Sequence, residues 1–441
     1  MSRELREISI EQQSTTEEHA KGSVIAEIER PAHASMVSCW TVLSKTAIGV
    51  GLLGLAAATA VCGWILGIVL LVVAGTSAMF TLHLINCMII KMEKRHVSFY
   101  TVAERYAPFS RWIVDVAIAV KSLGVGTAYF QVYGNEMARF VTRVAPQVSD
   151  SMSFFTLRVL IILLGLVVMI PICFRKSVSK TAIINVLGIL GITYIVIIGI
   201  VFTDPEYPSG STSLAPTGDF VSIAAKFPIF IFTFTCHQNM FLVGEDMRDR
   251  SQKKLDLVAF ISHLTGWLLF LPALVCPYVT YGSSVKSNFL DSLAANTEIG
   301  KSFAVLMGGL ALGIAEISAY PLQLFPCRRS TMVLVSRGRD LSVHEERKLR
   351  RILTGSILLL STVIAIFVQD LGVTLAVVGI IGSNTICFIM PSFLYCKSFD
   401  RKSGSKKWYA SACVCATSLI LLPICLTAII INAINKPAGS H

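Results

Sequence analysis

Eleven apolar stretches, each close to the length of a membrane-spanning helix, dominate this chain. A helix needs about 20 mainly apolar residues to cross the hydrocarbon core of a bilayer. Only 15% of the 441 residues are charged, against roughly a quarter in soluble proteins. The sequence therefore predicts an all-α integral membrane protein. The stretches lie near residues 37–60, 62–90, 112–141, 154–173, 179–202, 220–246, 258–283, 302–325, 352–370, 372–396 and 410–434.

Lys and Arg gather in alternate loops between these stretches, the pattern that marks the cytosolic side of a membrane. Most of the 38 basic residues lie in five such loops, at 91–111, 174–180, 247–257, 326–351 and 397–409. The opposite loops hold only Arg143, Lys286, Lys301 and Lys436. We therefore expect a cytosolic N-terminus and an extracytosolic C-terminus. The richest loop is expected to contain a short amphipathic helix around residues 344–348.

The span count predicts the organisation of the domain. An odd number fits two inverted repeats of five helices with one helix added. We expect a single transmembrane domain over 36–435, composed of one repeat at 37–202, a second at 220–396 and the extra helix at 410–434. The polar residues 1–35 are expected to form a disordered cytosolic tail, and residues 436–441 an extracytosolic one.

Two stretches contain sequences that a smooth lipid-facing helix would avoid. The first carries three glycines at positions 49, 51 and 54, and the sixth carries Pro228 and the polar residues 235–239. Unwound backbone at membrane depth survives only where it lines a cavity, and a matched pair of broken helices points to a transporter's binding site. Free N–H groups at a half-helix terminus favour a carboxylate. A simpler interpretation, in which the glycines only permit tight helix packing, stays open.

Three motifs carry a resemblance to a known family. Residues 49–55 (GVGLLGL) resemble the G-x-G-[IL]-L-G-L of the amino acid/auxin permease family. Residues 234–241 (FTCHQNMF) look like its sixth-helix signature, closest to fungal vacuolar amino-acid transporters, and residues 321–329 (PLQLFPCRR) resemble its eighth-helix exit. The resemblance covers about residues 35–435. It implies a LeuT-like fold, with helices 1 and 6 broken, and secondary active transport of amino acids by alternating access.

The resemblance also implies where the substrate binds. Its α-carboxylate and α-amine would meet the broken backbones of helices 1 and 6. The expected substrate-binding residues are Ile48, Gly49, Val50, Gly51, Phe232, Thr233, Cys236 and His237. For His237, two roles stay open, one in proton coupling and one in fixing the loop by hydrogen bonding.

Two departures from the family pattern bear on ion coupling. Sodium-coupled animal members have an Asn where this chain has Lys45, and a Thr hydroxyl where it has Ala319. An ammonium could replace the charge of the ion, so we favour proton coupling or sodium-independent exchange. Snorkelling of Lys45 toward the membrane surface is the competing interpretation. Charges inside a membrane are costly and usually functional, so Glu316 and Lys121 are further coupling candidates, either as an ion pair or as a proton or substrate site.

Other classes of function fit the sequence less well. It contains neither a repeated pore-lining helix nor an intramembrane catalytic motif, so we expect neither a channel nor an enzyme, and no cofactor or metal. The basic residues lie in loops, so no nucleic-acid partner is expected; the expected partners are an amino acid, a proton and the lipid bilayer. An amino-acid sensor with a transporter fold and little flux is the main alternative. The family resemblance favours a vacuolar or lysosomal membrane, with the plasma membrane as the alternative.

Overall fold

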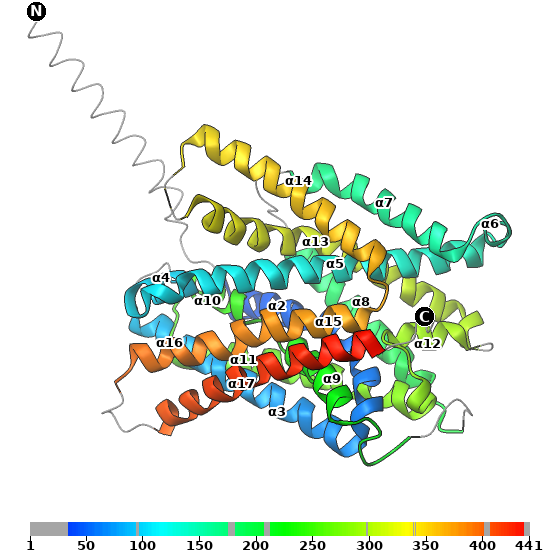
Figure 1. The fold of residues 1–441 in the computed structure, drawn as a ribbon, viewed down its shortest axis with the longest axis horizontal. Coiled ribbons are helices and arrows are strands. Elements are labelled where there is room, and N and C mark those ends of the chain that lie inside the picture. The colour runs from blue at the N-terminus through cyan, green and yellow to red at the C-terminus, as the bar shows by residue number, and fades with distance from the viewer. Residues whose placement is uncertain are drawn as a thin grey trace, which may run out of the picture.

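The computed structural model describes residues 34–93, 97–174, 181–206, 212–296, 299–337, 339, 341–400 and 406–435. Within these ranges the chain is helical, with one isolated β-bridge between Ala34 and Met247. Nine of the described helical segments are long and apolar enough to cross a membrane, and a further apolar helix is shorter, at Val186–Val201. The long helices lie side by side along the longest axis of the molecule (Figure 1). This confirms the prediction of an all-α membrane protein.

The first two predicted spans fall in one long helical run. Helix α2 (Met36–Ala47) begins at an N-cap formed by Ser35, and is followed by the 3-10 segment η1 (Val50–Gly54) and by α3 (Leu55–Lys91). Inside α3 the backbone leaves helical geometry at Gly63, with φ 74°. A side chain there would collide with the carbonyl of Ala215. This non-helical residue is the second residue of the predicted stretch 62–90, close to its boundary with 37–60.

The sixth predicted stretch is divided into two helices. Helix α9 (Phe220–Thr233) ends before a short non-helical segment, and α10 (His237–Asp246) follows it. The carboxylate of Asp219 caps the start of α9 by accepting the N–H of Ser222 at 2.9 Å. Hydrogen bonds from the side chain and backbone of Ser222 keep the pKa of Asp219 below its ordinary value.

The remaining helices overlap the other predicted stretches, except for α4, α6 and α12, which are short helices in segments expected to be loops. They are α4 (Phe99–Tyr106), α5 (Arg111–Val144), α6 (Gln147–Ser151), α7 (Phe154–Cys173), α8 (Thr181–Val201), α11 (Gln252–Tyr281), α12 (Phe289–Ala295), α13 (Phe303–Ser336), α14 (Val343–Phe367), α15 (Leu371–Val378), α16 (Met390–Ser398) and α17 (Lys406–Asn435). Short 3-10 turns add η2 (Pro108–Ser110), η3 (Gly282–Ser284) and η4 (Ile299–Lys301). Between α15 and α16 the helix widens into two π-helical segments, η5 (Gly379–Ser383) and η6 (Thr385–Ile389).

The spans differ in how deeply they are buried. In the most apolar window of Leu371–Ser398, 83% of the residues are buried, whereas the corresponding value for Lys406–Asn435 is 22%. The tenth predicted span is therefore central to the bundle, and α17 lies at its periphery. In Figure 1, α17 and α3 lie along one edge of the molecule and α7 and α14 along the other.

The loop expected at 326–351 is largely helical instead. Helix α13 continues to Ser336, and α14 begins at Val343 with a capping box formed by Ser342 and Glu345. Residues 344–348, where a short amphipathic helix was expected, are helical, but they form the first turns of the 25-residue helix α14. The two predicted tails, 1–35 and 436–441, lie outside the described residues except for Ala34 and Ser35.

Helices α5 and α13 form the central packing of the bundle. Gly126 of α5 faces the ring of Tyr320, and Gly313 of α13 faces the side chain of Met137. Such small residues let helix backbones approach closely inside a membrane. The hydroxyl of Tyr320 lies 2.7 Å from Ser361 Oγ, which ties this pair of helices to α14.

Candidate functional site

A small cavity lies where the interrupted segments meet α5 and α13. Its volume is about 10 Å³, which is close to the minimum of about 10–15 Å³ for a single water. A larger occupant would therefore require its walls to move. The lining residues are Thr46, Ala47, Gly49, Val50, Lys121, Val125, Tyr129, Phe232, Thr235 and Gln323. Gly49, Val50, Phe232 and Lys121 are the sequence-predicted candidates among them.

The break after α2 brings backbone to this cavity. Ile48 leaves helical geometry with ψ 97°, and Gly49 is extended. A Cβ built on Gly49 meets no other atom within 4 Å, whereas one on Gly51 would lie 2.9 Å from the ring of Phe232. The Cβ on Gly51 would also lie 3.2 Å from Thr233 Cα. Gly49 therefore borders open space, and Gly51 marks the place where the two interrupted helices touch.

The end of α9 and the segment that follows it contribute one lining residue each. Phe232 and Thr235 face the cavity. Thr233 directs its hydroxyl to the carbonyl of Ile229 at 2.7 Å, and Cys236 is fully buried in a separate apolar cluster. Of the eight predicted substrate-binding residues, five do not line the cavity: Ile48, Gly51, Thr233, Cys236 and His237.

His237 is turned toward α3. Its Nε2 lies 2.9 Å from the hydroxyl of Thr81 and 3.1 Å from the carbonyl of Ala78, and the side chain is fully buried. These contacts fix the first residue of α10 against α3. The geometry matches the loop-fixing role considered for this histidine.

Lys45 and Glu316 form a buried ion pair beside the cavity. Lys45 Nζ lies 3.9 Å from Glu316 Oε1, and their side chains are 5% and 0% exposed. No described residue hydrogen bonds to Lys45 Nζ or to either carboxylate oxygen of Glu316. Lys45 therefore points into the bundle rather than snorkelling to its surface. The lysine partner of Glu316 is Lys45, and Lys121 lines the cavity instead.

Gly188 of α8 makes room for the Lys45 side chain. A Cβ on Gly188 would lie 2.5 Å from Lys45 Cε and 2.9 Å from its Nζ. Any larger residue there would push the ammonium away from its present position. Three elements, α2, α8 and α13, thus position this pair.

Sequence reasoning missed six residues of the cavity wall, namely Thr46, Ala47, Val125, Tyr129, Thr235 and Gln323. Tyr129 accepts a hydrogen bond from Gln323 Nε2 at 3.4 Å, which joins α5 to α13. Polar groups within membrane spans usually face a cavity or a partner. The polarity of Tyr129 and Gln323 within their predicted spans could therefore have identified them. Thr46 accepts a 2.6 Å hydrogen bond from Asn239 Nδ2, which joins α2 to α10.

Metal ligands are not clustered in the part of the chain that the structure describes, where no group of three or more His, Cys, Asp or Glu could hold an ion. Two interrupted helices that enclose a buried cavity between membrane-length helices are typical of secondary transporters. The fold and the cavity therefore indicate a membrane transporter.

The comparisons with known proteins establish the family. Residues 32–434 match the family of transmembrane amino acid transporter proteins, and the chain belongs to this family. It is 29% identical over 357 residues to vacuolar amino acid transporter 5 of Schizosaccharomyces pombe, covering 80% of this chain and 82% of that one. It is 27% identical over 399 residues to vacuolar amino acid transporter 5 of Saccharomyces cerevisiae, with coverages of 79% and 85%. These findings confirm the resemblance seen in the motifs, and the family is one of transporters rather than enzymes.

A solved structure supports the fold. The crystal structure of MhsT in complex with L-phenylalanine matches 91% of this chain and 100% of its own, with a TM-score of 0.55 and 14% sequence identity. At this identity the likeness concerns the fold alone. It agrees with the LeuT-like architecture expected from the sequence.

Proposed function

We propose that this protein carries amino acids across a membrane by alternating access, with the substrate bound in the cavity between the interrupted helices. The observation that carries the proposal is the meeting of the two interruptions at Gly51 and Phe232, beside open space at Gly49. Family membership and the names of the relatives support amino acids as the substrate class.

The proposed topology has eleven crossings, in two inverted repeats of five with α17 added. The described run Met36–Lys91 has 56 residues, more than twice the roughly 20 needed for one crossing, so it accommodates two. The loop charges favour a cytosolic N-terminus and an extracytosolic C-terminus. In this arrangement α2 with η1 and α9 with α10 begin the two repeats as the broken helices.

Recognition of the substrate follows from the helix ends at the cavity. The first N–H groups of a helix and its last carbonyls have no partner within that helix. The start of η1, at Val50, offers N–H groups to the substrate carboxylate. The ends of α2 at Ala47 and of α9 at Thr233 offer carbonyls to its ammonium. Lys121, Tyr129 and Gln323 then face the rest of the substrate.

The proposed coupling does not use sodium. Lys45 places a buried ammonium beside Glu316, and Ala319, one turn further along α13, contributes no side-chain oxygen. A cation fixed to the protein would thus replace a bound sodium ion. Proton movement through this pair or sodium-independent exchange remains the proposed mode. The vacuolar relatives favour a vacuolar or lysosomal membrane over the plasma membrane.

The test is uptake by proteoliposomes that contain the purified full-length protein. A panel of labelled amino acids is offered without sodium, with and without an inward proton gradient. Saturable uptake of one class of amino acid, with empty liposomes as the control, would support transport, and a rise with the gradient would support proton coupling. Binding of amino acids without flux would instead support the alternative, a sensor that has kept the transporter fold.

A further inference from the structure

A second cavity lies at the end of the bundle where α5 ends and α13 begins. Its volume is about 140 Å³, while a single water needs about 10–15 Å³, so it has room for a small organic molecule. It shares no lining residue with the central cavity. The wall is formed by Glu136, Arg139, Thr142, Arg143, Leu290, Ala294, Gly300, Val305, Leu306 and Gly309.

One side of this outer cavity carries a buried acidic group. Glu136 is 4% exposed, and its Oε1 accepts hydrogen bonds from Arg139 Nη1 at 2.9 Å and Asn288 Nδ2 at 3.1 Å. Arg139 also donates to Asp291 Oδ1 at 2.5 Å. Two carboxylates therefore share one guanidinium in direct contact.

The second oxygen of Glu136 is left for a ligand. No described residue donates a hydrogen bond to Oε2, which would lie 2.6 Å from a Cβ on Gly309. An ammonium group supplies three donors and a compensating charge, so this side of the cavity is suited to a primary amine.

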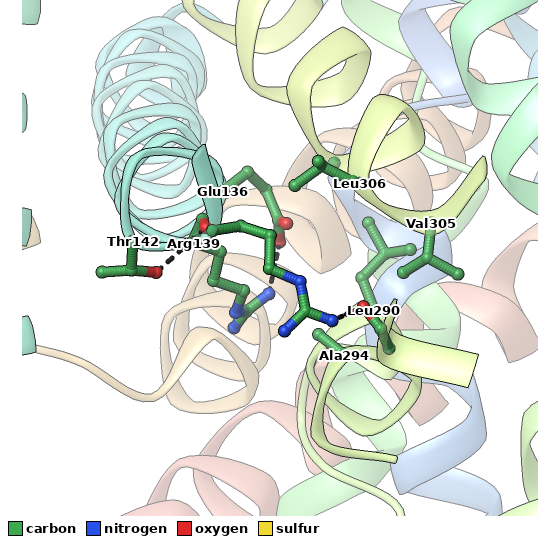
Figure 2. Close-up of a pocket in the computed structure, with 10 residues that line it drawn as sticks. Glu136, Arg139, Thr142, Leu290, Ala294, Val305 and Leu306 are labelled. Atoms are coloured by element: carbon green, nitrogen blue, oxygen red, sulfur yellow. Dashed lines mark hydrogen bonds and ion pairs between the residues drawn. The ribbon is translucent and has the colours of Figure 1, made fainter. Parts of the chain in front are cut away.

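The rest of the cavity is suited to a carboxylate and an apolar chain. Arg143 is exposed at the cavity, and among the described residues its one hydrogen-bond partner is the carbonyl of Gly300, which accepts from Nη2 at 3.0 Å. A guanidinium has five donors and pairs readily with a carboxylate. Figure 2 shows Glu136 and Arg139 on one side of the cavity and Leu290, Val305 and Leu306 on the other.

We propose that the outer cavity binds a second amino acid, with its ammonium on Glu136, its carboxylate on Arg143 and an aliphatic side chain against Leu290, Val305 and Leu306. The proposal rests on the proposed function, because the class of ligand is that of the transported substrate. Helix α12, which carries Leu290, also contacts η1. A molecule that bridges α5, α12 and α13 would therefore hold α12 against the interrupted helix of the central site.

The test is equilibrium binding of tritiated L-leucine to the full-length protein in nanodiscs. Val305→Trp fills the outer cavity and is expected to remove one bound leucine per protein. Ile314→Trp is the matched control, because Ile314 lies on the same helix with a side chain that is 50% exposed; it should bind as the wild type does. Unfolding temperatures close to that of the wild type establish that both variants fold.

A variant of the central site separates this proposal from the proposed function. Gly51→Val disturbs the contact between the interrupted helices, and Gly51 is not a lining residue of the outer cavity. One bound leucine that remains in Gly51→Val, and is lost when Val305→Trp is combined with it, would establish the outer site. Leucine binding that is unchanged by Val305→Trp would overturn the outer site. If leucine binding were then lost only in Gly51→Val, the proposed function would still stand.

Competition distinguishes an amino acid from a simple ion. In the Gly51→Val protein, 4-methylpentanoate retains the carboxylate and lacks the ammonium, whereas isoamylamine retains the ammonium and lacks the carboxylate. Each should compete at least about tenfold more weakly than L-leucine, because each loses one charge-assisted contact. Glu136→Gln should weaken leucine binding by a similar factor. Equal competition by either analogue would contradict recognition of the zwitterion.

Discussion

Lys45 Nζ of α2 lies 3.9 Å from Glu316 Oε1 of α13, at a depth where both side chains are almost inaccessible to solvent. The pair joins the interrupted first helix to one of the two helices at the centre of the bundle. Removing one partner of a buried ion pair leaves an uncompensated charge, while replacing both partners by apolar residues is often close to neutral. This asymmetry makes the contribution of the pair measurable.

Single substitutions in this pair should destabilise the protein far more than the double substitution. Lys45→Met or Glu316→Leu should each cost about 3–5 kcal/mol, because each leaves one buried charge without its partner. The double variant should regain most of that stability. Thermal unfolding of the purified protein in detergent measures the three changes. Additive losses would show that the two side chains do not interact.

Transport should continue when sodium is replaced by a large organic cation. The reason is that Lys45 places a fixed positive charge between α2 and α13, and Ala319 provides no oxygen ligand there. Uptake into proteoliposomes with matched ionic strength checks this. Strict dependence on sodium would contradict the interpretation of Lys45 and Ala319.

Substitution at Gly188 should impair transport by displacing Lys45. The new Cβ in Gly188→Ala would lie 2.5 Å from Lys45 Cε, closer than any real contact, so the ammonium must shift relative to Glu316. Gly191→Ala is the matched control, because on the same helix its Cβ would lie 4.0 Å from the nearest atom, Ala315 Cβ. Initial rates of uptake should fall only in the first variant. Equal rates would show that Lys45 need not keep its position.

Gly49→Ala should fold normally and bind substrate poorly. Gly49 has extended φ and ψ angles that alanine can adopt, and the added methyl points into open space. It would occupy much of a cavity of about 10 Å³. Gly355→Ala, on α14, also meets nothing within 4 Å and serves as the control. We expect an increase in KM with an unchanged unfolding temperature in Gly49→Ala only; wild-type KM would place the substrate elsewhere.

The predicted breaks in the first and sixth stretches rest on local causes. The glycines near Gly49 and the polar residues before Asn239 disfavour a continuous helix. This effect does not depend on how the neighbouring helices pack. The partner of Glu316 depends instead on how α2, α5 and α13 are rotated and set in height relative to one another. Lys45 and Lys121 are both lysines within predicted spans, and hydropathy does not distinguish which of them turns toward α13.

The lining of the cavity was predicted less completely for a related reason. A motif identifies a segment, but the direction of each side chain depends on the exact residue at which the helix ends. The motif around His237 was recognised, yet this residue begins α10 and turns to Thr81, while Thr235, two positions earlier, faces the cavity. Tyr129 and Gln323 come from helices without a break, so only their polarity could have drawn attention to them.

A structure of the protein in nanodiscs with a transported amino acid bound would test the central claim most directly. The amino acid is chosen from the proteoliposome panel and added at saturating concentration. We predict its carboxylate and ammonium between η1 and the end of α9, next to Gly49 and Val50, with Phe232 and Thr235 moved outward to enlarge the cavity. A bound amino acid that contacts neither interrupted helix would contradict the account.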